Sequence, residues 1–194
     1  MTTTVFAAPT INDYGKQPQI QMMDLSPDGS RVAYVRELNG ENVMLVVDVK
    51  TKKLLGGTRY ESLKPRGINF VNNDLILFSG SQTTKFRGVV SKVELFATMS
   101  YYVPKDKTIT MLGKNDRLYP GSSGSAGIFK IDEKRNIAYM DAREGLWGGA
   151  ENPINLYKVD LITGKGKRYK RGTPHTQNWF IGEDFQVKGR VDYH

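Results

Sequence analysis

The residues of this sequence that are best suited to binding chemistry lie mainly in one glycine-rich loop, residues 143–152. Trp147 stands among glycines there, and an exposed indole in such a setting is unusual without a partner. Arg143 in the same loop and Arg87 in an earlier one could each hold a carboxylate, because a guanidinium presents its donors as a fork. We therefore name Arg87, Arg143, Glu144 and Trp147 as candidate contacts for a substrate or partner. The alternative is that Trp147 covers the end of the core and that both arginines are solvated.

Composition excludes several kinds of catalytic and metal site. The chain has 194 residues and no cysteine, so it has no thiolate nucleophile, disulfide, iron–sulfur cluster or Cys-type zinc site. Its two histidines, His175 and His194, are too few for a His-rich metal site. We therefore expect no metal and no cofactor.

Charge and hydropathy leave the partner and the compartment open. The 28 Lys and Arg residues exceed the 20 Asp and Glu residues by 8, which makes an anionic partner possible without identifying one. Apolar runs such as Met44–Val47 are far shorter than the roughly 20 residues of a membrane span, so we expect none. The N-terminus lacks the basic and apolar regions of a signal peptide. Periplasmic, secreted and cytoplasmic locations all fit this sequence, so its localisation is unknown.

Short β-branched and aromatic runs, separated by turn signals, predict an all-β chain. Ile20–Leu25 ends at Ser26-Pro-Asp-Gly29, a turn in which Pro fixes φ and Gly accepts a positive φ. Arg31–Arg36 stops at Asn39-Gly40, a strong hairpin signal, and Val43–Val49 and a short fourth strand follow. These runs predict a four-stranded antiparallel meander with short connections.

The same unit recurs along the chain. Its first turns centre near residues 28, 73, 134 and 184, and a period of about 45–60 residues with four strands per unit is typical of β-propeller blades. A β-sandwich is the alternative, and it would show less regular groups of four strands. We predict a partial β-propeller of about three and a half four-stranded antiparallel blades. An N-terminal extension, residues 1–19, precedes blades at about residues 20–57, 66–113 and 126–170 and the start of a fourth at 176–194.

The broken fourth blade and the long loops both bear on partners. A blade that stops after two strands exposes ladder groups that proteins normally cover, so we expect either a longer parent chain or pairing with another chain. The up-and-down order of the strands places all the long loops on one face. Because long loops carry function more often than tight turns do, we predict that this face makes the working contact. The predicted long loops are Leu55–Gly67, Gly80–Lys92, Gly113–Ser125, Arg143–Pro153 and Arg171–Gln177.

Two further features have structural interpretations. Trp179 is predicted to be a buried aromatic residue of an inner strand. The run of residues 165–171 has five basic residues in seven, with Tyr169 among them, which would suit nucleic acid or another anionic surface. No recognised nucleic-acid motif accompanies this run, and basic residues blunt pairing along an outermost strand. We therefore favour a solvated edge strand and consider a nucleic-acid partner unlikely.

An ordered series of segments resembles a known family. Tyr14–Ile20, followed by Leu25-Ser-Pro-Asp-Gly-Ser-Arg-Val-Ala-Tyr-Val35, is similar to the start of bacterial S9-family serine peptidases, the relatives of prolyl oligopeptidase and acylaminoacyl peptidase. Ser-Pro-Asp-Gly alone occurs in many unrelated propellers, whereas the ordered series runs along nearly the whole chain. The later segments are Arg66–Ile76, which is similar to the second blade, and then Asn155–Gly164, Thr176–Gly182 and Arg190–Tyr193.

The resemblance implies a propeller that precedes an α/β-hydrolase domain and admits only short or unstructured peptides to its site. The chemistry of that family belongs to the hydrolase domain, with a Ser on a G-x-S-x-G elbow and then Asp and His. The nearest run here, Gly121–Gly127, has no Ser with Gly at both −2 and +2. We therefore expect no catalytic residue in this chain.

Three functions stay open after this comparison. The first is a non-catalytic propeller segment of a serine peptidase, which meets its peptide substrate through a hydrolase domain absent from this sequence. The second is a stand-alone interaction module that completes its ring by self-association, as a homodimer through exposed blade edges. The third, with less support, is an anion- or nucleic-acid-binding domain.

Overall fold

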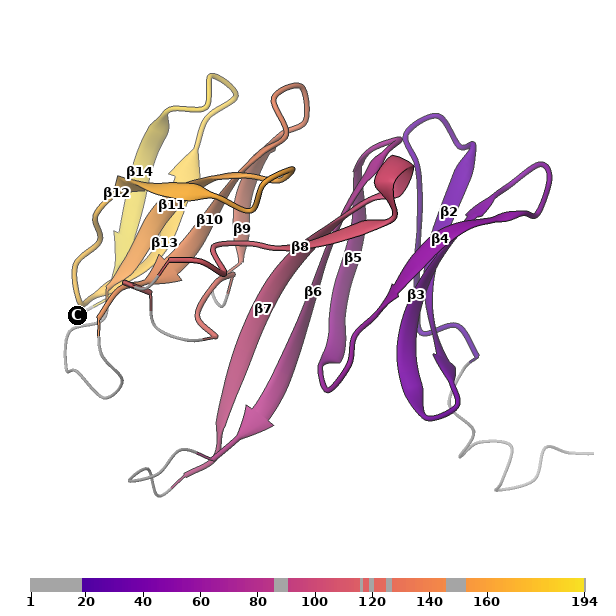
Figure 1. Ribbon diagram of the computed structural model, residues 1–194. Coiled ribbons are helices and arrows are strands. Elements are labelled where there is room, and N and C mark those ends of the chain that lie inside the picture. Colours follow the sequence, from indigo (N-terminus) through magenta and orange to yellow (C-terminus); the bar gives the residue numbers. More distant parts are fainter. Residues whose placement is uncertain are drawn as a thin grey trace, which may run out of the picture.

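The computed structural model describes residues 19–85, 91–115, 117–118, 121–124, 127–145 and 153–193. These residues form fourteen strands in four antiparallel sheets, three with four strands and one with two. In every sheet the strands follow one another in sequence order, and Figure 1 shows the sheets arranged one after another along the chain. A β-sandwich would gather the strands into two sheets. The predicted fold class, an all-β partial propeller of about three and a half blades, is therefore confirmed.

The first and third connections of each four-stranded sheet are short. A 3₁₀ turn, η1 (Val103–Lys105), lies between the third and fourth strands of the second sheet. The sheets consist of β1 (Met22–Leu25), β2 (Arg31–Leu38), β3 (Glu41–Asp48) and β4 (Leu54–Arg59); β5 (Lys64–Asn72), β6 (Leu75–Thr84), β7 (Val93–Tyr102) and β8 (Lys107–Thr110); β9 (Ile128–Asp132), β10 (Ile137–Arg143), β11 (Ile154–Asp160) and β12 (Gly166–Lys170); and β13 (Thr176–Ile181) and β14 (Val187–Asp192).

Local residues determine the first two turns. Asp28 accepts hydrogen bonds from the backbone N–H of Ser30 at 2.9 Å and from the hydroxyl of Ser26 at 2.7 Å. These bonds, the backbone one first, lower the pKa of Asp28 to about 2. In the next hairpin, residues 39 and 40 have φ values of 54° and 83°, and two positive φ angles are what a two-residue type I′ turn requires. The two turn motifs of the sequence therefore adopt the predicted conformations.

Strands continue into two of the predicted long loops. Within Gly80–Lys92, β6 continues to Thr84 and pairs with the start of β7 as far as Val93. Within Leu55–Gly67, β4 continues to Arg59 and β5 begins at Lys64. Sequence reasoning missed these extensions because their residues are polar or glycine and show no apolar alternation. Backbone pairing in register with the neighbouring strand nevertheless satisfies their N–H and C=O groups.

The core lies between the sheets. Ala33 and Val35 of β2 pack with Ile76 and Phe78 of β6, and this contact joins the first and second sheets. A second cluster joins the second and third sheets, and a third one places Trp179 against the third sheet. Trp179 is buried, which confirms the prediction made for it. The inward face of each blade is thus buried against its neighbour, as in a propeller.

The connections divide between two faces, which we name here. The tight-turn face carries the first and third connections of each sheet, for example residues 26–30, 73–74, 133–136 and 161–165. The crossover face carries the second connections and the links from one sheet to the next. Figure 1 shows the short coil of η1 and the short turns at its upper side.

Candidate functional site

Arg143 and Glu144 lie where β10 ends, on the crossover face. Glu144 forms an isolated antiparallel bridge with Leu118, so the segment before the third sheet lies beside the end of β10. The backbone N–H of Arg143 donates to the Ser122 hydroxyl at 3.3 Å. Two connections that are separate in the sequence therefore meet at this point of the crossover face.

The carboxylate of Glu144 is shared between two neighbouring strands. One oxygen accepts a hydrogen bond from the hydroxyl of Tyr157 in β11, and the other pairs with the guanidinium of Arg168 in β12. Burial first, and then the hydrogen bond to Glu144, raise the pKa of Tyr157 above its usual range. Both oxygens are engaged, so this arrangement acts as a clamp that fastens Glu144, the residue after β10, to β11 and β12.

The other two predicted contact residues, Arg87 and Trp147, lie outside the described residues. Arg143 and Glu144, which are consecutive in the sequence, both lie at one edge of the crossover face. The role of all four as contacts for a substrate or partner stays a prediction.

A second polar cluster on the crossover side was not found by sequence reasoning. Glu94 at the start of β7 accepts hydrogen bonds from the hydroxyls of Ser81 and Thr83 on β6, and Arg66 of β5 pairs with the same carboxylate at 3.1 Å. The two hydroxyls, Ser81 first, lower the pKa of Glu94 to about 2. These contacts depend on cross-strand register in the β6–β7 hairpin. The part of β6 at residues 80–84 was predicted to be a loop, so the sequence did not indicate this register. The cluster holds a carboxylate in its charged form but leaves it no free oxygen.

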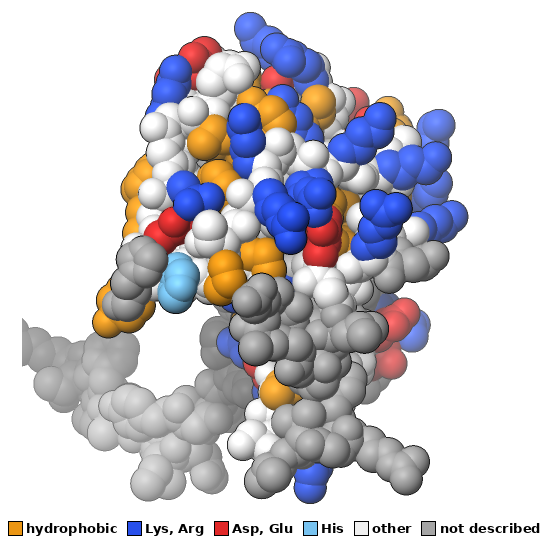
Figure 2. Space-filling view, turned by 90° about the vertical axis from the view of Figure 1, so that its left-hand side faces the viewer, with side chains coloured by type: hydrophobic (Ala, Val, Ile, Leu, Met, Phe, Trp, Pro, Cys, Tyr) orange, Lys and Arg blue, Asp and Glu red, His pale blue; other side chains and the backbone are white. Residues whose placement is uncertain are grey.

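The basic run at residues 165–171 forms an outermost strand, as predicted. β12 is the edge strand of the third sheet, and Lys167, Arg168 and Lys170 are exposed. Lys158 of β11 lies over the ring of Tyr169, with its Nζ 3.7 Å from the ring centroid. Figure 2 shows many Lys and Arg side chains with hydrophobic ones between them at this end of the molecule.

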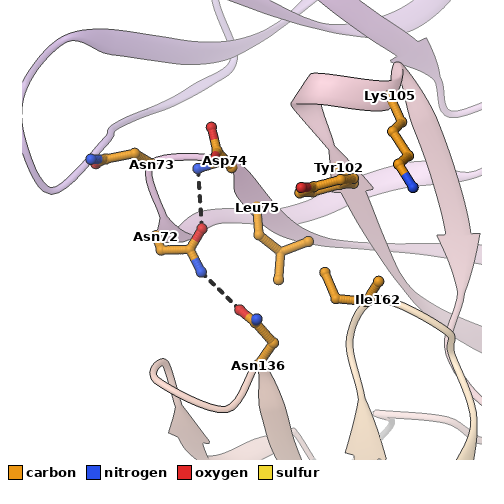
Figure 3. A pocket seen from close by; sticks show the side chains of 8 residues that line it. All are labelled: Asn72, Asn73, Asp74, Leu75, Tyr102, Lys105, Asn136 and Ile162. Carbon is orange, nitrogen blue, oxygen red and sulfur yellow. Dashed lines mark hydrogen bonds between the residues drawn. The ribbon is translucent and has the colours of Figure 1, made fainter.

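A pocket of about 550 Å³ lies on the tight-turn face, where the second and third sheets meet. Four connections contribute to it: the β5–β6 turn, the residues around η1, the β9–β10 turn and the β11–β12 turn. Leu75 and Ile162 supply apolar surface, and Figure 3 shows them near the centre of the view. The other lining residues are Asn72, Asn73, Asp74, Tyr102, Lys105 and Asn136.

One hydrogen bond joins the two sheets at this pocket. The side-chain amide of Asn72 donates to the side-chain oxygen of Asn136 at 2.8 Å, across 64 residues of sequence. The sequence analysis used both segments only as turn signals. The repeat could have indicated that these two turns are neighbours. The first turns of successive blades occupy the same place in the repeat, so they lie next to each other on one face.

The described residues contain no group of three or more His, Asp or Glu side chains that could hold a metal ion. None of their helical segments is both long and apolar enough to cross a bilayer.

Comparison with known proteins gives a likeness of fold. No protein-family profile and no curated protein sequence matches the chain. Among solved structures, an acylaminoacyl peptidase in complex with Z-Gly-Gly-Phe-chloromethyl ketone is 12% identical with a TM-score of 0.50, and the match covers 84% of this chain and 26% of that one. An acylaminoacyl peptidase from Pyrococcus horikoshii is 14% identical with a TM-score of 0.48, over 79% and 25% of the two chains. Hydrazine synthase from Kuenenia stuttgartiensis is 14% identical with a TM-score of 0.47, over 73% and 40%.

The match with a TM-score of 0.50 agrees with the fold, and at 12% identity it shows the fold alone. The chain spans no more than 40% of the length of the three proteins that it matches.

Proposed function

We propose that this chain is the non-catalytic propeller segment of a serine peptidase of the prolyl oligopeptidase type. It would shape and restrict the access of short peptides to an α/β-hydrolase domain outside this sequence. The chain itself would make and break no bonds; it would select substrates by size and by docking.

The observation that carries this proposal is the likeness in fold to an acylaminoacyl peptidase, which extends over 84% of this chain. The ordered segments that resemble the same group, from residues 14–35 to residues 190–193, agree with it independently of the coordinates. A propeller suits such a role because its blades surround a narrow passage that folded proteins cannot enter.

The exposed apolar face of the first sheet supports a larger assembly. On the outer face of the first sheet, Leu25, Val32, Val47 and Leu54 lie in one row across four strands. Leu25 and Leu54 are 57% and 63% exposed. Each of the described sheets buries its inward face against its neighbour, so an apolar outward face of this extent is expected to receive a further sheet.

In this proposal the crossover face is the working face. The clamp of Glu144 with Tyr157 and Arg168 would hold the end of β10 in a fixed position, so that Arg143 meets the hydrolase domain or the peptide. Arg143 would contact a carboxylate there, for which a guanidinium fork is suited.

The test begins with the native protein. An antibody against this chain is used to isolate its product from the cells that make it, and the mass and the hydrolysis of short peptides are measured. We expect a product well above 21.8 kDa that cleaves a short peptide and spares the same peptide within a folded protein. Arg143→Ala in that product should weaken cleavage, whereas Lys107→Ala on the exposed β8 should not. A product of 21.8 kDa without peptidase activity would refute the proposal.

Self-association is a second candidate, because a second copy could cover the same apolar faces. Phe180 and Val191 on the outward face of the fourth sheet are 56% and 40% exposed, which gives the opposite end a matching apolar surface. Light scattering should then report a dimer that becomes a monomer in Leu25→Asp, with Thr110→Asp as the control. A monomer at all concentrations would exclude this candidate.

A further inference from the structure

The pocket between the second and third sheets has a hydrogen-bonding pattern of its own. It lies on the tight-turn face, opposite the face on which the proposed function depends. Its polar side chains come from connections of two different blades, so no single turn creates the pattern.

The side-chain amide oxygens around the pocket are already engaged, and so is one carboxylate oxygen of Asp74. The side-chain oxygen of Asn72 accepts from the backbone N–H of Asp74 at 3.1 Å, and that of Asn136 accepts from Asn72. The side-chain oxygen of Asn73 accepts from the backbone N–H of Asp28 at 3.2 Å, and Asp74 itself forms an ion pair with Arg31. Because backbone N–H groups can only donate, they set which end of the Asn72 and Asn73 amides is the oxygen.

Three donor groups, in contrast, have no partner among the described residues. Lys105 has no ion-pair or hydrogen-bond partner among the described residues, and the acid next to it, Asp106, is bonded to the Tyr101 hydroxyl. The amide nitrogen of Asn136 and the hydroxyl of Tyr102 likewise have no partner within the described part of the chain. Figure 3 shows the Asn136 nitrogen on the side of Ile162, the Tyr102 oxygen turned toward Leu75, and Lys105 beyond the Tyr102 ring.

The unpaired hydrogen-bond donors and the apolar side chains beside them indicate which kind of ligand the pocket would bind. A ligand that fills this space must bring hydrogen-bond acceptors, and the ammonium of Lys105 favours those that are negatively charged. Leu75 and Ile162 favour an apolar body on the same molecule. The geometry points to a binding site for a small organic carboxylate with an apolar side chain, held by Lys105 and Asn136 over Leu75 and Ile162.

N-acetyl-L-leucine is the probe for this site, and its amide, N-acetyl-L-leucinamide, is the same molecule without the charge. Binding is followed by NMR through the side-chain amide signals of Asn72 and Asn136, together with the backbone signals of the lining residues. We expect saturable shifts with the acid and no more than weak ones with the amide. Inorganic phosphate, an anion with no apolar part, should bind at least about tenfold more weakly than the acid.

Two variants and one matched control test the named groups. Lys105→Met keeps the length of the side chain and should weaken binding of the acid by about tenfold or more. Asn136→Asp keeps the oxygen that Asn72 needs and replaces the free donor with a negative charge, so binding should be lost. Lys107→Met removes the same charge two residues away, outside the pocket lining, and should leave affinity within about twofold.

The site is refuted if the amide binds as tightly as the acid, or if Lys105→Met binds like the unchanged chain. Equal affinity for phosphate would overturn the apolar part of the assignment. Retained backbone spectra of the variants show that they are folded. Because the pocket and the crossover face are on opposite sides, failure here leaves the peptidase proposal untouched.

Discussion

The indole Nε1–H of Trp179 donates a hydrogen bond to the backbone oxygen of Ile154 at 3.0 Å. Ile154 opens β11, whereas Trp179 belongs to β13, so the bond connects the third sheet with the two-stranded sheet. Both residues are buried in the cluster between these sheets. The two-stranded sheet is therefore held by a buried, directional polar contact in addition to apolar packing.

Removal of the hydrogen bond between Trp179 and Ile154 should lower the stability of the fold. Trp179→Phe keeps an aromatic ring but leaves the Ile154 oxygen buried without a partner, so we expect the free energy of unfolding to fall by about 1–3 kcal/mol. Urea denaturation followed by circular dichroism measures the change. The matched control is Tyr193→Phe, at a residue that is 76% exposed, which should alter stability by less than about 0.5 kcal/mol. Equal stability of the two variants would show that the bond contributes nothing.

Two buried tyrosines should respond in opposite directions when their hydroxyls are removed. The Tyr60 hydroxyl is buried and has no hydrogen-bond partner among the described residues, whereas the Tyr101 hydroxyl bonds to Asp106. Tyr60→Phe removes an unsatisfied polar group and should raise the free energy of unfolding by about 1 kcal/mol, while Tyr101→Phe should lower it by a similar amount. Thermal and urea denaturation of both variants provide the measurement. A loss of stability in Tyr60→Phe would mean that its hydroxyl is hydrogen-bonded in solution.

The Glu94 cluster should make the free energy of unfolding depend on pH in the acid range. Its pKa is lowered from 4.5 to about 2 in the folded chain, chiefly by the Ser81 and Thr83 hydroxyls. A lowered folded-state pKa contributes stability that is fully present above about pH 4.5 and is lost as the pH falls toward 2. The difference in unfolding free energy between the unchanged chain and Glu94→Gln should therefore shrink over this interval. Glu37→Gln on the exposed end of β2 is the control, and a difference that stays constant with pH would contradict the prediction.

Asp24 should be important for the docking of the first sheet on the second. One of its carboxylate oxygens accepts the backbone N–H of Phe70 at 2.7 Å, which links β1 to β5. Asp24→Ala leaves this N–H without its partner, so its hydrogen exchange should accelerate and stability should fall by about 1 kcal/mol. Asp24→Asn keeps an acceptor oxygen and should preserve most of the protection. If both variants exchange alike, the carboxylate is not the acceptor in solution.

Local chemistry explains why much of the fold could be predicted. Turn signals such as Ser26–Gly29 and Asn39-Gly40 act over four residues or fewer, so they identify strand ends without knowledge of the rest of the chain. Their recurrence was sufficient to predict four-stranded units and a partial propeller. Where polar or glycine residues continue a strand, as at residues 80–84, the local signal is absent and the prediction of a loop was wrong.

The sequence by itself therefore determined the strands, their meander order, the absence of thiol chemistry and the resemblance to a peptidase family. Only the tertiary structure decided which polar groups have partners. Glu144 meets Arg168 across 24 residues through the arrangement of strands within the third sheet, and Asn72 meets Asn136 across 64 through the packing of the second sheet against the third. Sheet packing is determined by burial of apolar faces over the entire chain, so the contacts that it creates between distant side chains cannot be read from short segments.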